Sequence, residues 1–201
     1  MDFGCGEGSL SGELRDAGWK SVVGIDVSHS RVARATRRFP GIAFDDRGIQ
    51  ALPDYRGAFD LIVMDNVIEH LPRPLEVLAQ LGECLAAGGV LVAITPNMES
   101  GQFRLLGRRW TQELSPHAHI FLFTEAALRK AVAMAGFQVA GAGKFHLPPA
   151  LGHALREFGR AHRVKDLVWR LGHEVAATYG RLIRSGEMVY AVGRKPPSTA
   201  C

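Results

Sequence analysis

The 201-residue sequence has few cysteines and no long apolar run. Its three cysteines, Cys5, Cys84 and Cys201, show no metal-binding spacing and are odd in number. This argues against a disulfide framework and favours a reducing compartment. The longest clean apolar runs, such as residues 90–94, are far shorter than the roughly 20 residues that span a bilayer. No charged segment followed by an apolar one opens the chain, so we expect a cytoplasmic protein without a transmembrane segment or export signal.

Internal repeats and low-complexity tracts are absent too, and aromatic residues make up only 8% of the chain. With 47% hydrophobic and 22% charged residues, the composition is typical of a globular protein and excludes disordered and fibrous classes. The length suits one domain, so residues 1–201 are predicted to form a single unit.

Short β-branched runs alternate with amphipathic segments of helical length, which predicts βαβ units and a parallel sheet. The predicted elements fall into two sets. Strands are expected at 1–3, 21–25, 42–44, 59–64, 90–95, 137–143 and 187–192. Helices are expected at 9–17, capped by Ser9, at 28–39, capped by Ser28, at 74–86 and at 124–135. In the third helix, Leu75, Leu78, Leu81 and Leu85 form the predicted apolar stripe.

Residues 150–184 depart from this alternation, because they contain two helical patterns in a row. We expect them to form a helical insertion before the last strand. The insertion holds seven Lys and Arg against three Asp and Glu, a local charge equal to the net +4 of the whole chain. A solvated helical face is one interpretation. The other is a basic lid or docking surface for an anionic substrate or a lipid headgroup at the membrane surface.

The strongest motif is the glycine loop Asp2-Phe3-Gly4-Cys5-Gly6-Glu7-Gly8, directly before a predicted helix. Glycines at alternate positions let the backbone turn tightly and approach a ligand closely. Asp26 ends the second predicted strand about 20 residues further on, where a carboxylate can accept hydrogen bonds from ribose hydroxyls. The motif therefore predicts a nucleoside-binding site at the carboxyl end of the first strand.

The spacing of this loop separates two cofactor classes. A dinucleotide fingerprint G-x-G-x-x-G would need a glycine at position 9, which is Ser9 here. A nucleoside with an amino-acid tail has no pyrophosphate to hold, and Asp2 then suits its ammonium group. We therefore expect S-adenosylmethionine rather than NAD.

These residues, together with FDLIVMDNVIEHL (residues 59–71) and LAAGGVLVAITPN (residues 85–97), resemble class I S-adenosylmethionine-dependent methyltransferases. The resemblance extends from Asp2 to about Gly143, and it is closest to the subgroup of ubiquinone-biosynthesis O-methyltransferases and small-molecule methyltransferases. It implies an α/β fold with a Rossmann-like, seven-stranded, mostly parallel sheet, an antiparallel last strand and helices on both faces. Relatives usually have a longer first strand after upstream helices, so the resemblance implies a shortened first strand and a chain truncated at its N-terminus.

The resemblance also implies which residues bind the cofactor. The adenine contact would come from Asp46, or instead from Ile49 through its backbone or its apolar side chain. The whole expected set is Asp2, Gly4, Cys5, Gly6, Gly8, Asp26, Val27, Asp46, Ile49, Asp65 and Asn66.

Candidate catalytic residues follow the fourth predicted strand, at the edge of the sheet where the site is expected. Methyl transfer to a hydroxyl gains from a base that removes the proton. His70 is the first candidate for that base and His119 is the second, and Glu69 directly precedes His70. The resemblance offers an alternative in which Glu69, His70 and His119 hold a divalent cation. We favour the base without a metal.

The sequence thus predicts a methyltransferase that acts on an oxygen of a small molecule, such as a sugar, a quinone precursor or a lipid-linked glycan. An RNA 2′-O-methyltransferase is the second hypothesis, which the expected confinement of basic residues to 150–184 disfavours. A non-catalytic nucleoside-binding or partner subunit is the third. DNA is not an expected partner, and the oligomeric state is left open.

Overall fold

The computed structural model describes residues 1–100, 103, 119–145 and 188–197. Thirteen elements lie in this part of the chain. The strands are β1 (Asp2–Phe3), β2 (Val23–Ile25), β3 (Ala43–Asp45), β4 (Phe59–Asp65), β5 (Leu85–Pro96), β6 (Gln138–Phe145) and β7 (Met188–Arg194). The helices are α1 (Ser9–Asp16), α2 (His29–Arg38), α3 (Pro74–Cys84), α5 (Glu125–Met134) and the 3₁₀ helices η1 (Gly48–Tyr55) and η2 (Ile68–His70). The insertion expected at 150–184 lies outside the described residues.

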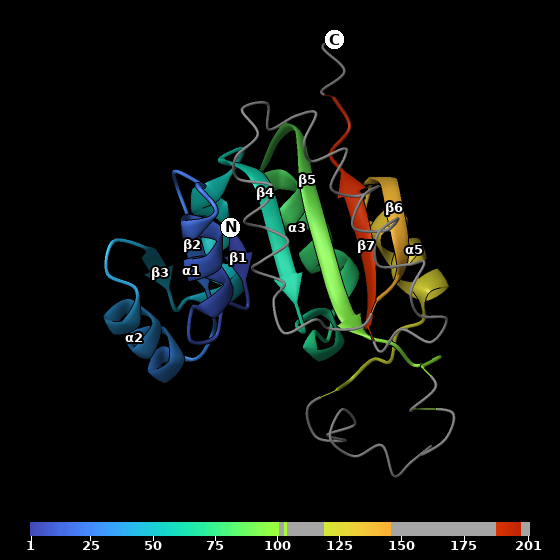
Figure 1. Ribbon diagram of the computed structural model, residues 1–201. Coiled ribbons are helices and arrows are strands. Elements are labelled where there is room, and N and C mark those ends of the chain that lie inside the picture. The colour runs from blue at the N-terminus through green and yellow to red at the C-terminus, as the bar shows by residue number, and fades with distance from the viewer. Residues whose placement is uncertain (101–102, 104–118, 146–187, 198–201) are drawn as a thin grey trace.

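All seven strands form one sheet, in the order β3-β2-β1-β4-β5-β7-β6 (Figure 1). Neighbouring strands from β3 to β5 are parallel, whereas β7 is antiparallel to both β5 and β6. The first strand is only two residues long, yet it pairs on both sides, with Asp2 opposite Gly24 and Val63. The expected fold class is confirmed, including the short first strand.

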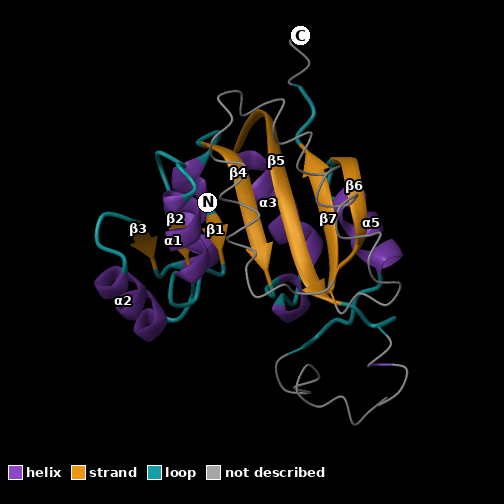
Figure 2. Ribbon diagram, viewed as in Figure 1, coloured by secondary structure: helices purple, strands orange, loops and turns teal. Residues whose placement is uncertain are grey.

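Helices cover both faces of this sheet (Figure 2). The larger apolar cluster fills the side of α3 and α5, with Ile62, Met64, Leu78, Leu81 and Leu128 among its buried members. On the opposite side, Leu14 of α1 packs with Leu61 and Val63 of β4 in a second cluster. Among the residues that the structure describes, no helix is both long and apolar enough to cross a bilayer.

The predicted cap of the first helix was wrong, whereas the N-cap residue of α2 is Ser28, as predicted. Gly8, in the left-handed conformation at φ 80°, occupies the N-cap position of α1, and Ser9 lies inside the helix. Ser28 occupies the N-cap position of α2, but its side chain makes no capping hydrogen bond. The carboxylate of Asp26 accepts the amide of Ser28 itself, at 2.8 Å.

The third helix is shorter than predicted, because α3 ends at Cys84 and β5 already begins at Leu85. The predicted stripe was also wrong at Leu75, which is 36% exposed, whereas Leu78 and Leu81 are fully buried. Each residue advances about 100° around an α-helix, so steps of three drift away from the buried face. Leu75 therefore points away from the side on which Leu81 packs.

Leu78 and Leu75 provide a test of how α3 packs on the sheet. Leu78→Ala removes side-chain atoms from a closed core and should lower the free energy of unfolding by about 2–5 kcal/mol. Leu75→Ala, on the same helix, should cost less than about 1 kcal/mol, because that side chain already contacts solvent. Urea unfolding measures both changes. Equal losses in the two variants would contradict the orientation of α3.

Candidate functional site

Three backbone amides of the glycine loop donate hydrogen bonds to the end of β2 and to Asp26, which directly follows it. The amides of Gly4 and Cys5 both donate to the carbonyl of Ile25, at 2.7 and 3.0 Å. The amide of Gly6 donates to Oδ2 of Asp26 at 2.9 Å, and the amide of Ser28 donates to Oδ1 at 2.8 Å. Asp26 is 9% exposed, so its carboxylate is fixed in place between the loop and the start of α2.

The three glycines of the loop serve different purposes. Gly4 has φ +83°, and a Cβ there would lie 2.2 Å from Cγ2 of Val67, so this position brings the loop against the segment after β4. Gly8 has φ +80° and meets the ring of Phe44. Gly6 has φ +54° and would meet nothing within 4 Å, so it borders open space. The loop therefore has an open side beside Asp26, which fits the approach of a nucleoside.

A pocket of about 270 Å³ lies between this loop, α1 and the end of β4. Four of the predicted cofactor residues, Asp2, Gly4, Cys5 and Asp65, line it. The other lining residues are Glu7, Ser9, Leu10 and Glu13. The structure thus brings together residues that are more than 60 positions apart in the sequence, at the carboxyl ends of β1 and β4.

Two aspartates of this pocket bind protons more readily than usual. Asp2 is 2% exposed and accepts a hydrogen bond of 2.6 Å from Oγ of Ser11, and burial raises its pKa to about 6. Burial and the charge of Glu13 raise the pKa of Asp65 to about 6, against a hydrogen bond from Nδ2 of Asn66. A cation in the pocket would favour the ionised form of both carboxylates. The pocket is therefore electrostatically suited to a positively charged ligand.

The expected adenine side lies beyond Asp26 and exposes two apolar side chains. Val27 is 79% exposed and Ile49 is 45% exposed. A Cβ at Gly48 would lie 2.4 Å from Cγ1 of Val27, so Val27 lies directly against that glycine. Apolar surfaces of this kind suit the faces of a purine ring. Asp46, the expected adenine contact, forms an ion pair with the imidazole of His29 in this structure.

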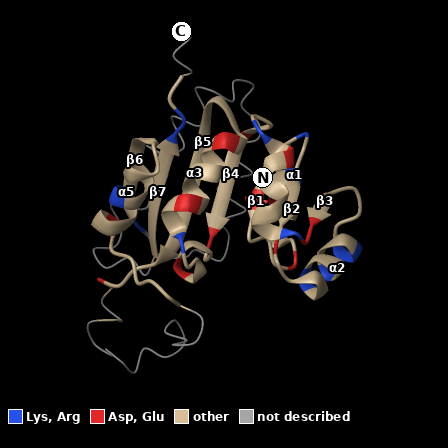
Figure 3. Ribbon diagram, turned by 180° about the vertical axis from the view of Figure 1, so that it is seen from behind, with Lys and Arg blue, Asp and Glu red and all other residues tan. Residues whose placement is uncertain are grey.

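Basic side chains also gather on α2, which carries four arginines and no acidic residue (Figure 3). Arg34 pairs with Glu7, and Arg38 donates to Oγ of Ser9. The expectation that basic residues are confined to 150–184 was therefore wrong, and the argument that it supplied against an RNA partner is weaker.

The segment after β4 turns sharply at Asn66, which has φ 53° although it is not glycine. Its amide donates to the carbonyl of Ile94 at 3.0 Å, which ties the turn to β5. Residues held in this conformation cost about 1–3 kcal/mol and are concentrated at functional sites. The turn places Asp65 at the pocket and leads directly into η2, which contains Glu69 and His70.

Glu69, His70 and His119 meet at this edge of the sheet. One ligand atom from each residue lies within 4.8 Å of the others. The rings of His70 and His119 are 4.7 Å apart between centroids, and Nε2 of His70 lies 3.9 Å from Oε1 of Glu69. Two backbone hydrogen bonds hold the segment after His119 beside Glu69. The carbonyl of Glu69 accepts the amides of Ile120 and Phe121 at 2.8 and 3.1 Å.

Glu69 is 1% exposed, and its two oxygens differ. Oε2 accepts a hydrogen bond of 2.9 Å from Oγ1 of Thr95, whereas Oε1 has no hydrogen-bond partner within the described part of the chain. Nδ1 of His119 is also buried without such a partner there. Burial raises the pKa of Glu69, while burial and the neighbouring His70 lower the pKa of His119. The group can therefore accept a proton, or supply one carboxylate and two neutral imidazoles to a cation.

Sequence reasoning missed three residues of this region: Glu13, His29 and Thr95. Glu13 lies three positions after Leu10 on α1, so a shared helical face was the available signal. Thr95 lies near the end of the strand beside β4, where parallel strands bring their carboxyl ends together. Nothing in the spacing of His29 indicated a partner 17 residues away.

Comparison with known proteins agrees with this geometry. The methyltransferase domain family matches residues 1–141. The chain is 35% identical over 111 residues to a trans-aconitate 2-methyltransferase of Methylobacterium nodulans, covering 54% of this chain and 42% of that protein. It is 32% identical over 123 residues to a ubiquinone biosynthesis O-methyltransferase of Pseudomonas aeruginosa, covering 58% and 53%. The chain thus spans about half, or less, of these curated relatives.

Solved structures share the fold. A methyltransferase from Mesorhizobium loti, described as S-adenosylmethionine-dependent, superposes with a TM-score of 0.64 at 20% identity, covering 96% of this chain and 88% of that one. A putative methyltransferase from Haloferax volcanii, solved with the Trm112 activator, gives a TM-score of 0.67 at 19% identity, covering 100% and 82%.

The raised pKa of Asp65 predicts a pH-dependent stability. Because the folded carboxyl binds its proton more tightly than the unfolded one, its contribution favours folding at low pH and is lost as the pH rises from about 4 to about 6. Asp65→Asn removes this loss and should be more stable than the wild type above pH 6, by up to about 3 kcal/mol. Urea unfolding at pH 4 and pH 7.5 measures the difference in the free energy of unfolding between Asp65→Asn and the wild type. A difference of equal size at both pH values would contradict the raised pKa of Asp65.

Proposed function

This chain belongs to the S-adenosylmethionine-dependent methyltransferases, and we propose that it methylates an oxygen atom of a small molecule. The acceptor class would be a sugar, a quinone precursor or a lipid-linked glycan. The observation that carries the proposal is the position of His70 and His119 beside buried Glu69, at the sheet edge that also carries the cofactor pocket. A relative that is a ubiquinone biosynthesis O-methyltransferase supports oxygen as the acceptor atom.

The described residues fit the cofactor of this family. Asp26 would accept hydrogen bonds from the ribose hydroxyls, and the open side of Gly6 would admit the nucleoside. Val27 and Ile49 would contact the adenine, and Asp46 would be freed from His29 to bind it. The methionyl end would lie in the pocket toward Asp2 and Asp65. When bound, the cofactor supplies a methyl group made electrophilic by its sulfonium.

His70 is the proposed general base. A hydroxyl attacks a methyl group faster when its proton is removed during the attack, which contributes about 10²- to 10⁴-fold. His70 is 38% exposed at its side chain, so it can contact an acceptor and return the proton to solvent afterwards. Glu69 lies 3.9 Å away and would stabilise the charged imidazole that results. His119 would support the ring of His70 from the other side.

A second arrangement uses the same three residues to hold a divalent cation. Within the described residues, Oε1 of Glu69 and Nδ1 of His119 are buried without a hydrogen-bond partner, which favours this arrangement because a cation would satisfy both atoms. One carboxylate and two imidazoles suit zinc or manganese better than magnesium, which prefers oxygen ligands. In this arrangement the cation would lower the pKa of the acceptor hydroxyl.

The two arrangements predict different kinetics for an acceptor found among phenols and sugars. With His70 as the base, the rate depends on a neutral imidazole at this position, which takes up the proton of the acceptor hydroxyl. His70→Ala should then lower kcat by about 10²- to 10⁴-fold, with little change in affinity for the cofactor. Full activity in His70→Ala would contradict both arrangements, and no turnover of any phenol or sugar would contradict the proposed acceptor class.

Chelation separates the arrangements further. If His70 acts alone, EDTA should leave the rate unchanged, and His119→Ala should cost much less than His70→Ala. If a cation is held, EDTA should abolish activity, added zinc or manganese should restore it, and the loss of any of the three ligands should be equally severe. We expect the first outcome.

A further inference from the structure

The pocket beside the glycine loop contains more negative charge than its own protein contacts explain. Four carboxylates line it, from Asp2, Glu7, Glu13 and Asp65, and no lysine, arginine or histidine is among its lining residues. Glu7 is paired with Arg34 at 2.9 Å. Within the described part of the chain, none of the other three forms an ion pair. Their negative charge is therefore available to a ligand.

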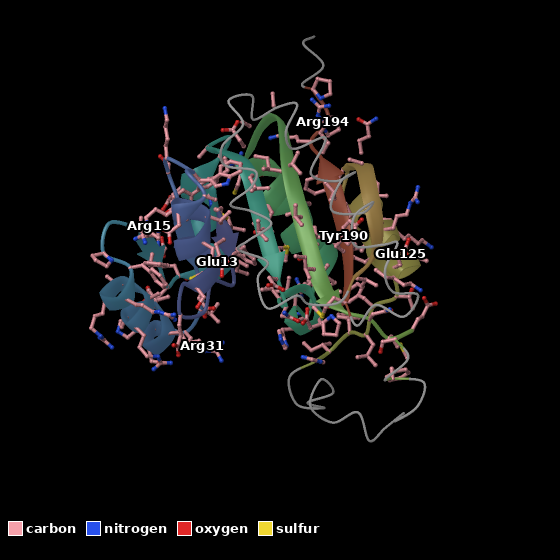
Figure 4. All side chains as sticks on the ribbon, viewed as in Figure 1. Glu13, Arg15, Arg31, Glu125, Tyr190 and Arg194 are labelled. Atoms are coloured by element: carbon pink, nitrogen blue, oxygen red, sulfur yellow. The ribbon has the colours of Figure 1, made fainter. Side chains whose placement is uncertain are left out.

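Glu13 is the member of this group that no sequence motif assigned. It lies on α1, on the side that faces β4, while Arg15 lies on the other side of the helix (Figure 4). Its side chain is half-buried and lines the same pocket as Asp65, whose pKa its charge raises. Two like charges side by side oppose folding unless a cation compensates them.

We propose that Glu13 is a specificity residue of the cofactor site. Its carboxylate recognises the two positive charges at the methionyl end of S-adenosylmethionine. The inference rests on the proposed cofactor site, because the nucleoside end is assigned to Asp26 and Gly6 and only the methionyl end remains for the pocket. The ammonium and the sulfonium, two positive charges, offset part of the repulsion among the three carboxylates of Glu13, Asp2 and Asp65.

The assignment has a consequence for turnover. Methyl transfer converts the sulfonium into a neutral thioether, so S-adenosylhomocysteine keeps the ammonium but has one positive charge fewer. The attraction of Glu13 is therefore weaker for the product than for the substrate. Glu13 favours binding of the methyl donor and release of the product, which a neutral residue at this position would not do.

Three adenine nucleosides separate the charges in a calorimetric titration of the full chain. S-adenosylmethionine carries both positive charges, S-adenosylhomocysteine carries the ammonium, and 5′-methylthioadenosine lacks the amino-acid tail. Glu13→Gln should weaken binding of S-adenosylmethionine by about tenfold, weaken S-adenosylhomocysteine by less, and leave 5′-methylthioadenosine unchanged. Asp16→Asn, on the same helix but paired with Arg15 on the surface, should change none of the three.

The same titrations show which idea fails. Unchanged binding of S-adenosylmethionine in Glu13→Gln, or an equal loss for all three nucleosides, would overturn the role of Glu13, since the second result indicates a structural effect. If the wild-type chain bound none of the three nucleosides, the proposed cofactor site itself would be wrong. Retained binding of 5′-methylthioadenosine also shows that the Glu13→Gln variant is folded.

Discussion

The carboxylate of Asp26 organises the whole site through the two backbone amides that it accepts. Oδ2 binds the amide of Gly6 and Oδ1 binds that of Ser28, so one side chain fixes both the glycine loop and the entry to α2. Because hydrogen bonds to a charged carboxylate are strong, these part-buried bonds hold the loop before any ligand arrives. The loop held in this way borders open space at Gly6, where an added Cβ would meet nothing within 4 Å.

From this fixed loop, the site extends along the carboxyl edge of the sheet. Gly4 contacts Val67, which couples the loop to the turn after β4, and that turn leads to Glu69. The carbonyl of Glu69 then holds the chain that follows His119. Cofactor pocket and candidate base are thus parts of one continuous backbone path. A substitution in the loop should therefore change the positions of His70 and His119, although they lie more than 60 residues away in sequence.

Much of this arrangement could be predicted from the sequence, because alternating apolar runs and one glycine loop define a doubly wound sheet. The strand that ends just before Asp26 and the strand that ends at Asp65 follow from the local apolar pattern. The cap at Gly8, the outward position of Leu75 and the pair between Asp46 and His29 could not be predicted, because they depend on how elements pack. The same holds for the partnership of Glu69 with Thr95, which needs the strand order.

The central claim is that Asp26 and the loop it fixes form the nucleoside site, and calorimetry with S-adenosylmethionine tests it most directly. Asp26→Ala should weaken binding at least tenfold, because it removes the ribose acceptor and releases Gly6. Gly6→Val should have a similar effect, since its side chain would fill the open space. Thermal unfolding of each variant confirms that the fold is retained. Wild-type affinity in both folded variants would contradict the account.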